Sequence, residues 1–162
     1  MTLAYDNSDL DHAILTLVAD ARHNLHRNHA TSRPLSENYE RVGLEGEYEC
    51  ACFLRWHGIM VEVDTASRPG GDGRADFRVG GVSVDVKTAR KAYNLLREAD
   101  KPHADILVLA AYKDDRATLL GWEYDEAMVA CPSKDFGYGI VNHYMAAHEL
   151  KSIGLLPVAV SP

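Results

Sequence analysis

The stretch that decides the fold reads GRADFRVGGVSVDVK and runs from Gly73 to Lys87. Apolar and polar residues alternate on both sides of its central glycine pair, which is the pattern of two strands joined by a two-residue hairpin turn. We expect these strands at 75–79 and 82–87. Counting outward from the turn pairs Asp76 with Asp85, so the two carboxylates should lie opposite each other on one face of the hairpin.

The second arm of this hairpin adds a lysine to the two carboxylates. Side chains alternate between the faces of a strand, so Asp85 and Lys87 project to one side while Val84 and Val86 can pack in the core. Facing carboxylates repel each other, and a bound divalent cation removes that cost. Magnesium takes oxygen ligands from one or two carboxylates and leaves room for a phosphate oxygen, while a nearby lysine can orient water. The pattern therefore suits metal-assisted phosphodiester hydrolysis.

The flanking sequence predicts the remaining elements. Two segments have the apolar periodicity of amphipathic helices, 8–27 and 36–57. Three have the composition of strands, namely 59–64, the uninterrupted apolar run 104–112, and 118–124. The basic segment 88–103 is expected to be partly helical, with a short strand at 93–96 as the alternative. Loops and short helices are expected after 125.

Length and composition limit the class of protein. The chain has 162 residues, of which 46% are hydrophobic and 25% charged, which is typical of one domain with a sizeable core. We expect a single domain over 1–162, with 1–34 as an N-terminal helical extension, 36–125 as the core and 126–162 as a wrapping segment. Without an apolar run of ~20 residues, no membrane helix or membrane partner is expected. An acidic N-terminus and three cysteines without CxxC spacing favour a cytoplasmic protein.

Over about residues 40 to 125 the chain resembles the PD-(D/E)xK nuclease superfamily, which includes restriction endonucleases, Holliday-junction resolvases and RecB-type nuclease domains. Asp76 stands where the family has its first acidic residue, with Ala75 in place of the usual proline, and 85–87 matches the (D/E)xK tripeptide. The resemblance implies an α/β fold with a restriction-endonuclease-like αβββαβ core, a mixed central sheet flanked by helices, and here an extra N-terminal helix.

The resemblance also implies a catalytic site. Asp76, Asp85 and the carbonyl oxygen of Val86 would bind Mg²⁺, for which Mn²⁺ could substitute, and Lys87 would position the nucleophilic water. The family often adds a glutamate from the preceding helix, and the sequence Gly46-Glu47 makes Glu47 the matching residue, catalytic and bound to the metal directly or through water.

Two neighbouring glutamates, Glu45 and Glu49, lie one helical turn apart on a common face and remain alternatives to Glu47. Gly43 and Gly46 weaken the same helix by ~1 kcal/mol each relative to alanine. A close approach of the helix backbone to the sheet or to the substrate would account for them.

The charge distribution points to a confined nucleic-acid surface. The net charge is −7, but residues 66–101 carry eight basic and five acidic side chains, so this window is +3 and the rest of the chain −10. Thr88, Arg90 and Lys91 follow the tripeptide directly and Arg74 precedes Asp76, which makes these four the candidate contacts to phosphate. We expect a basic strip around a metal site on an otherwise acidic surface.

The function predicted from these residues is metal-dependent hydrolysis of DNA phosphodiester bonds. The alternative is a catalytically inactive module of the same fold that binds nucleic acid or a protein partner. An acidic protein that mimics DNA is a weaker third hypothesis. Domains of this size often pair to cut two strands, so a homodimer is compatible with the predicted function.

Overall fold

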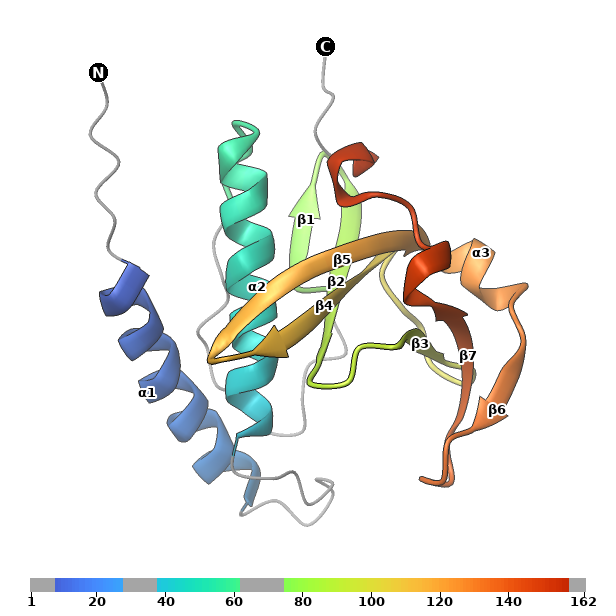
Figure 1. The fold of residues 1–162 in the computed structure, drawn as a ribbon, viewed down its shortest axis with the longest axis horizontal. Coiled ribbons are helices and arrows are strands. Elements are labelled where there is room, and N and C mark those ends of the chain that lie inside the picture. Colours follow the sequence, from blue (N-terminus) through green and yellow to red (C-terminus); the bar gives the residue numbers. More distant parts are fainter. Residues whose placement is uncertain (1–7, 28–37, 62–74, 158–162) are drawn as a thin grey trace.

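Two helices pack side by side at one end of the molecule (Figure 1). The computed structural model describes residues 8–27, 38–61 and 75–157. Within them, α1 spans Ser8–Arg27 and α2 spans Tyr39–Trp56, which confirms both predicted helices. None of the described helices is both long enough and apolar enough to cross a bilayer.

A mixed sheet of four strands in the order β1-β2-β4-β5 forms the centre. Its strands are Phe77–Val79 (β1), Val82–Ala89 (β2), Ile106–Lys113 (β4) and Arg116–Tyr124 (β5). The β1–β2 and β4–β5 pairs are antiparallel, whereas β2 and β4 are parallel. All four strands lie where the sequence predicts them, and together they make the fold an α/β fold with a mixed sheet.

The β1–β2 hairpin has the predicted register. Val79 pairs with Val82 and Phe77 with Val84 across the turn. Gly80 and Gly81 have φ angles of +55° and +85°, a left-handed conformation that side chains with a Cβ rarely adopt. Two such residues in a row form the tight turn that matches the twist of the strands, so the glycine pair fixes the register.

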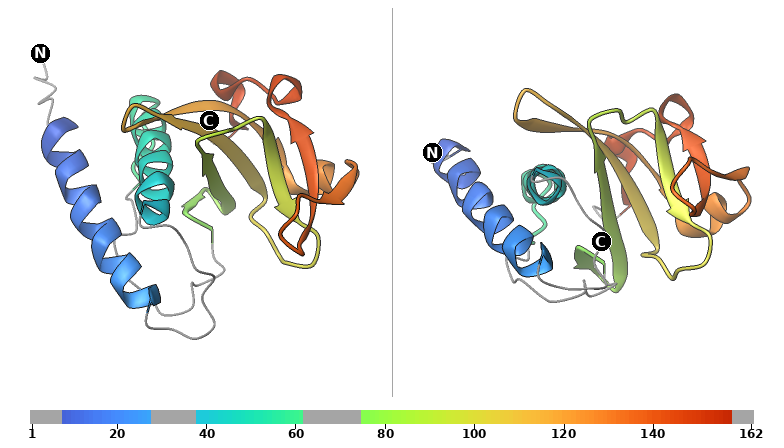
Figure 2. Two further views of the ribbon diagram at one scale, coloured as in Figure 1. Left: turned by 60° about the horizontal axis from the view of Figure 1, so that its bottom comes forward. Right: turned by 90° about the horizontal axis from the view of Figure 1, so that it is seen from below.

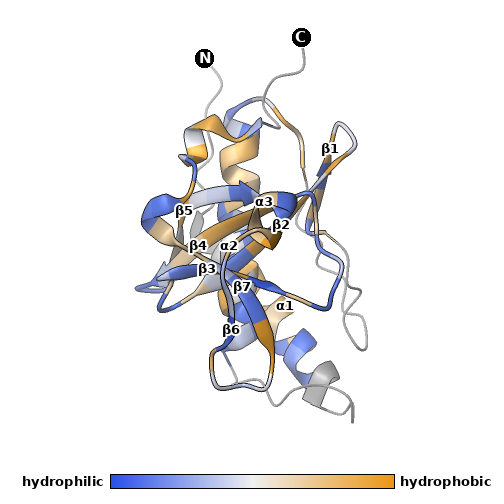
Figure 3. Ribbon diagram, turned by 90° about the vertical axis from the view of Figure 1, so that its right-hand side faces the viewer, coloured by the Kyte–Doolittle hydropathy of each residue, from blue (hydrophilic) through white to orange (hydrophobic). Residues whose placement is uncertain are grey.

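One face of the sheet is covered by α2, and α1 lies outside α2 (Figure 2). The buried valines of β2, Val84 and Val86, pack in one core with Cys50 and Leu54 of α2. Hydrophobic residues follow β2 and β4 through this layer (Figure 3). The predicted inward direction of the two valines is thereby confirmed.

A second sheet, in the order β3-β7-β6, covers the other face (Figure 2). It consists of Asn94–Glu98 (β3), Ser133–Asp135 (β6) and Val141–Ala146 (β7). Leu95 of β3 packs against Leu107 and Leu109 of β4, next to Met128. Met128 belongs to α3, a short helix at Asp125–Val129, and two 3₁₀ turns follow at Ala147–Glu149 and Ile153–Leu155.

The second sheet corrects three sequence predictions. Residues 88–103 form no helix, and the alternative of a short strand is right. Residues 126–162 contain two strands besides the expected loops and short helices. The central sheet is therefore flanked by helices on one face and mainly by strands on the other, and the chain from β2 to β4 lacks the helix that an αβββαβ core places there.

The predicted strand at 59–64 does not form in its described part, 59–61, and 62–64 lie outside the described residues. Val61 is buried in the main core, and its carbonyl oxygen accepts a 3.0 Å hydrogen bond from Nε of Arg55. The backbone at this point is thus tied to the end of α2 rather than to a neighbouring strand.

Candidate active site

The candidate site lies where β1 begins and β2 continues beyond it. From Asp85 to Ala89, β2 pairs with β4 on one side, and no described strand pairs with its other side. Asp76 immediately precedes β1, and its Oδ2 accepts a 2.7 Å hydrogen bond from the backbone N–H of Val86. Because the N–H and C=O of a residue in an extended strand point to the same side, the carbonyl of Val86 also faces this open edge.

Asp85 and Lys87 come together on β2, two residues apart as alternation requires. Nζ of Lys87 lies 2.5 Å from Oδ2 of Asp85. The Asp85 side chain is 14% exposed and that of Lys87 42%, so the pair opens to solvent from the lysine side. Burial lowers the pKa of Lys87, but the charge of Asp85 and the hydrogen bond to it outweigh burial and raise the pKa above its usual value. Lys87 is therefore an ammonium ion at neutral pH.

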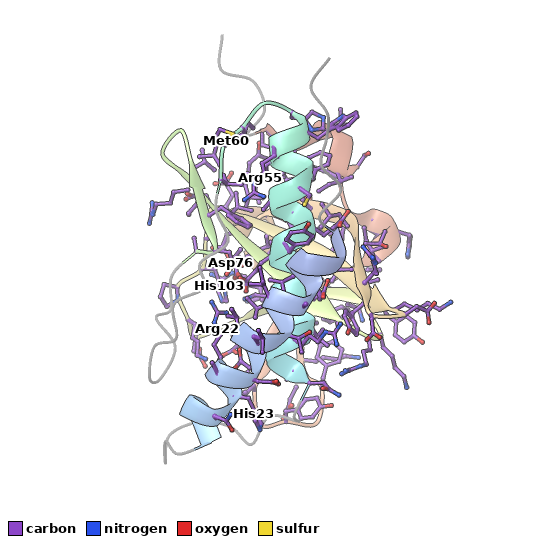
Figure 4. All side chains as sticks on the ribbon, turned by 90° about the vertical axis from the view of Figure 1, so that its left-hand side faces the viewer. Arg22, His23, Arg55, Met60, Asp76 and His103 are labelled. Atoms are coloured by element: carbon purple, nitrogen blue, oxygen red, sulfur yellow. The ribbon has the colours of Figure 1, made fainter. Side chains whose placement is uncertain are left out.

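The surroundings of Asp76 disfavour the charged form of its carboxyl group. Burial raises its pKa well above the usual value, and the charges of Glu47 and Asp85 raise it further. The N–H of Val86 and the ammonium of Lys87 act in the opposite direction without cancelling the rise. Figure 4 shows Asp76 beside α2, the helix that carries Glu47. Two acidic groups thus disfavour the charge of Asp76, and one lysine favours it.

The geometry separates the neighbouring glutamates. Glu45 is buried at 1% exposure and forms an ion pair with Arg41, with Oε1 3.8 Å from Nε. Glu49 acts on the thiol of Cys50, whereas Glu47 is the glutamate whose charge acts on Asp76. Among the three, Glu47 is the one that the structure associates with Asp76.

The donor set fits a divalent cation with few protein ligands. Within the described residues, no three His, Cys, Asp or Glu side chains meet in an arrangement that could hold a metal. Mg²⁺ needs only one or two carboxylates because it keeps several waters. Asp76 and Asp85 offer hard oxygen ligands, and burial, followed by the charges of Glu47 and Asp85, raises the pKa of Asp76, so a bound cation would stabilise its charged form.

The candidate phosphate contacts differ in their surroundings. Thr88 has a buried Oγ1 with no hydrogen-bond partner, and a Cβ built at Gly46 would lie 1.8 Å from it. Gly46 therefore lets α2 approach β2 closely at Thr88. Arg90 and Lys91 are exposed in the connection after β2, and Arg74 lies outside the described residues.

Sequence reasoning missed a pocket at the end of the sheet next to this connection. The pocket has a volume of about 250 Å³ and is lined by Asn38, Arg41, Arg90, Tyr112, Asp114 and Asp115. Arg41 had no signal of its own in the sequence beyond its position four residues before Glu45. Apart from Asn38, its neighbours in the pocket come from distant parts of the chain, so only the fold assembles this set.

Two of the three cysteines, Cys50 and Cys131, are poor nucleophiles in this structure. Cys50 is fully buried, and burial, with the charges of Asp76 and Glu49, raises its pKa to about 12. Burial also raises the pKa of Cys131, helped by the charges of Glu123 and Glu149. Since the thiolate is the nucleophile, these two thiols are unsuited to nucleophilic catalysis at neutral pH.

Comparison of the chain with protein families, with characterised proteins and with solved structures finds no match. The function must therefore be inferred from the chemistry of these side chains.

Proposed function

We propose that the protein is a metal-dependent nuclease of the PD-(D/E)xK type that hydrolyses DNA phosphodiester bonds. The observation that carries the proposal is the meeting of Asp76, Asp85 and Lys87 at the open edge of β2, with Glu47 acting on Asp76 from α2. If this set had only a structural role, the mutual repulsion of its carboxylates would destabilise the fold with no compensating function. In a metal site, the same repulsion raises the affinity for a cation.

In this proposal Asp76 and Asp85 hold Mg²⁺ or Mn²⁺, together with the Val86 carbonyl and with Glu47 directly or through water. A bound ion of this kind acts as a Lewis acid on the phosphate and lowers the pKa of a bound water. The Val86 N–H fixes Oδ2 of Asp76. Lys87, as an ammonium ion, donates hydrogen bonds to the attacking water or to a phosphate oxygen and stabilises the negative charge that develops there.

The same proposal includes the assignment of the α/β fold to the restriction-endonuclease-like type. A restriction-endonuclease-like core is supported by the order helix, hairpin and parallel strand, which α2, β1–β2 and β4 supply. Here β3 stands in place of the family's crossover helix, so the proposed member is an unusual one. DNA as partner, a homodimer as working form and a cytoplasmic location are also parts of the proposal.

One observation favours the alternative of an inactive module that binds nucleic acid. Oδ2 of Asp85 is engaged by Lys87, an internal counter-charge that partly replaces a metal ion. Such a module would bind DNA with no need for Mg²⁺ and would not cut it. Binding and cleavage must therefore be measured separately.

The deciding experiment incubates purified protein with duplex, single-stranded and branched DNA and with RNA, in Mg²⁺, in Mn²⁺ and in EDTA. We expect metal-dependent cleavage of DNA that is lost in Asp85→Asn and kept in Asp100→Asn, which removes an exposed carboxylate from a turn. Circular dichroism should show both variants folded. Absence of cleavage on every substrate would refute the nuclease, and retained DNA binding in that case would favour the inactive module.

A further inference from the structure

Basic side chains from separate parts of the chain lie together at one end of the central sheet, the edge that its strand ends form. Because β2 and β4 are parallel, their carboxyl ends lie at the same edge, where β5 also begins. Arg90 and Lys91 follow β2, Lys113 ends β4 and Arg116 begins β5. All four side chains are exposed. The first turn of α2 adds Arg41, which shares a pocket with Arg90.

The acidic groups at this edge are fewer than the basic ones, and each has a polar or charged partner. Asp114 and Asp115 form the β4–β5 turn with φ angles of 51° and 61°. Asp115 Oδ1 accepts a 3.0 Å hydrogen bond from the hydroxyl of Tyr112, and Asp114 lies 4.0 Å from Nζ of Lys113. With the buried Glu45 and with Glu40 in the same turn of α2 as Arg41, the described residues of this edge carry four carboxylates and five cations. This edge therefore carries a small positive excess, in contrast to the chain as a whole.

The pocket at this edge of the sheet is lined by a guanidinium group whose hydrogen-bonding capacity is incompletely used. Nε of Arg41 is buried and has no hydrogen-bond partner. Its nearest carboxylate oxygens, on Glu45 and Asp115, lie 3.8 Å from Nε and 3.9 Å from Nη2, beyond hydrogen-bonding distance. The guanidinium of Arg90 lies 5.5 Å from the centre of the Tyr112 ring and is held there by a cation–π contact.

We infer that this pocket binds a phosphate group of a nucleic-acid strand, with Arg41 and Arg90 as the donors. Planar guanidinium groups bind the oxygens of a phosphate in pairs, and the volume of about 250 Å³ admits such a group. Arg90 follows Lys87 by three residues, which at ~3.3 Å per residue places the pocket ~10 Å along the strand from the proposed catalytic lysine. The inference rests on the proposed nuclease function and adds a second contact to the same strand.

The test uses inorganic phosphate and oligonucleotides in EDTA, so that no cleavage intervenes. Titration with phosphate, followed by NMR of the arginine Nε–Hε signals, should shift Arg41 and Arg90. In DNA binding, Arg90→Gln should reduce the salt slope by about 0.7–0.9, the value for one lost phosphate contact. The double variant with Arg41→Gln should weaken binding about tenfold or more. Lys134→Gln, at an exposed position of β6 in the second sheet, should leave both quantities unchanged.

A 5′-phosphorylated and a 5′-hydroxyl oligonucleotide identify the source of the phosphate. Loss of affinity on both substrates indicates an internal phosphodiester, and loss on the phosphorylated one alone indicates a terminal phosphate. Arg41→Gln removes the ion-pair partner of Glu45, so Arg90→Gln also serves as the variant that leaves that pair intact.

Unchanged binding and salt slope in Arg90→Gln and in the double variant would overturn the inference even if the protein cuts DNA. Conversely, phosphate binding at Arg41 and Arg90 without cleavage under any metal would sustain the inference and refute the nuclease.

Discussion

The backbone N–H of Val86 donates its hydrogen bond to the side chain of Asp76, where a neighbouring strand would supply a carbonyl oxygen. The carboxylate is thereby fixed at the edge of β2, next to Asp85 and within the electrostatic reach of Glu47. The hydrogen bond holds Asp76 in a place where its negative charge is unfavourable. Several measurable consequences depend on that conflict.

The first is a gain in stability on neutralising Asp76. Asp76→Asn keeps an oxygen acceptor for Val86 and removes the charge that burial, Glu47 and Asp85 disfavour. A carboxyl whose pKa is raised by folding binds its proton more tightly in the folded state, so the wild type loses stability as pH rises above the unfolded value of about 3.9. In EDTA at pH 7 we expect a higher Tm for Asp76→Asn than for the wild type.

The pH dependence supplies the control. The difference in Tm between Asp76→Asn and the wild type should shrink as pH falls through the folded pKa of Asp76 and vanish below about 3.9, where Asp76 is protonated in both states. Asp100→Asn, at an exposed position, should show neither the gain nor its pH dependence. A lower Tm for Asp76→Asn at pH 7 would mean that the carboxylate is well accommodated, contrary to its raised pKa.

The second consequence is stabilisation by divalent cations. An ion that binds only the folded state adds RT ln(1 + [L]/Kd), or about 2.7 kcal/mol at a hundredfold excess over Kd. For a domain of this size, each kcal/mol raises Tm by about 2–4 °C. Differential scanning fluorimetry should show this rise for the wild type in Mg²⁺ or Mn²⁺, reversal by EDTA, and a much smaller rise for Asp76→Asn and Asp85→Asn. Equal rises in all three proteins would locate the ion elsewhere.

A separate prediction concerns the contact between α2 and β2. Gly46→Ala would place a Cβ 1.8 Å from Oγ1 of Thr88, and such overpacking costs about 1–3 kcal/mol. Gly43→Ala is the matched control, because its Cβ would meet nothing within 4 Å and the helix should gain about 1 kcal/mol. Urea unfolding should therefore move the two variants in opposite directions.

Removing the opposing hydroxyl tests the cause of that loss. Thr88→Ala in the Gly46→Ala background eliminates Oγ1 and Cγ2 and should recover part of the lost stability. If the double variant is as unstable as Gly46→Ala alone, the contact with Thr88 is not the reason for the glycine.

These consequences involve residues that sequence reasoning reached to different degrees. The hairpin was predictable because a period of two and a glycine pair both determine the register, so Asp76, Asp85 and Lys87 follow by counting. The second sheet was not, because the buried positions of β3 alternate between Leu95 and Arg97, and a buried arginine hides the apolar alternation. Arg97 is paired with Asp125, which only the fold brings near.

The pocket escaped sequence reasoning for a related reason. Arg41 and Arg90 lie 49 positions apart and meet because β2, β4 and α2 begin or end at one edge. The charge excess of residues 66–101 predicted a basic strip, but Arg41, Lys113 and Arg116 lie outside that window. Local charge counts cannot include residues that topology alone makes neighbours.

The last prediction separates the chemistry of Lys87 from metal binding. Nζ of Lys87 forms an ion pair with Oδ2 of Asp85, so Lys87→Ala frees that oxygen and removes a positive charge from the site. Mg²⁺ should then bind at least as tightly as in the wild type, measured by calorimetry. Cleavage should fall by about 10²–10³-fold, the usual loss when one donor to a developing negative charge is removed. Asp85→Asn should lose both binding and cleavage. If Lys87→Ala instead weakens Mg²⁺ binding and cleaves normally once saturated with metal, then Lys87 supports the ligands and has no part in the attack on phosphate.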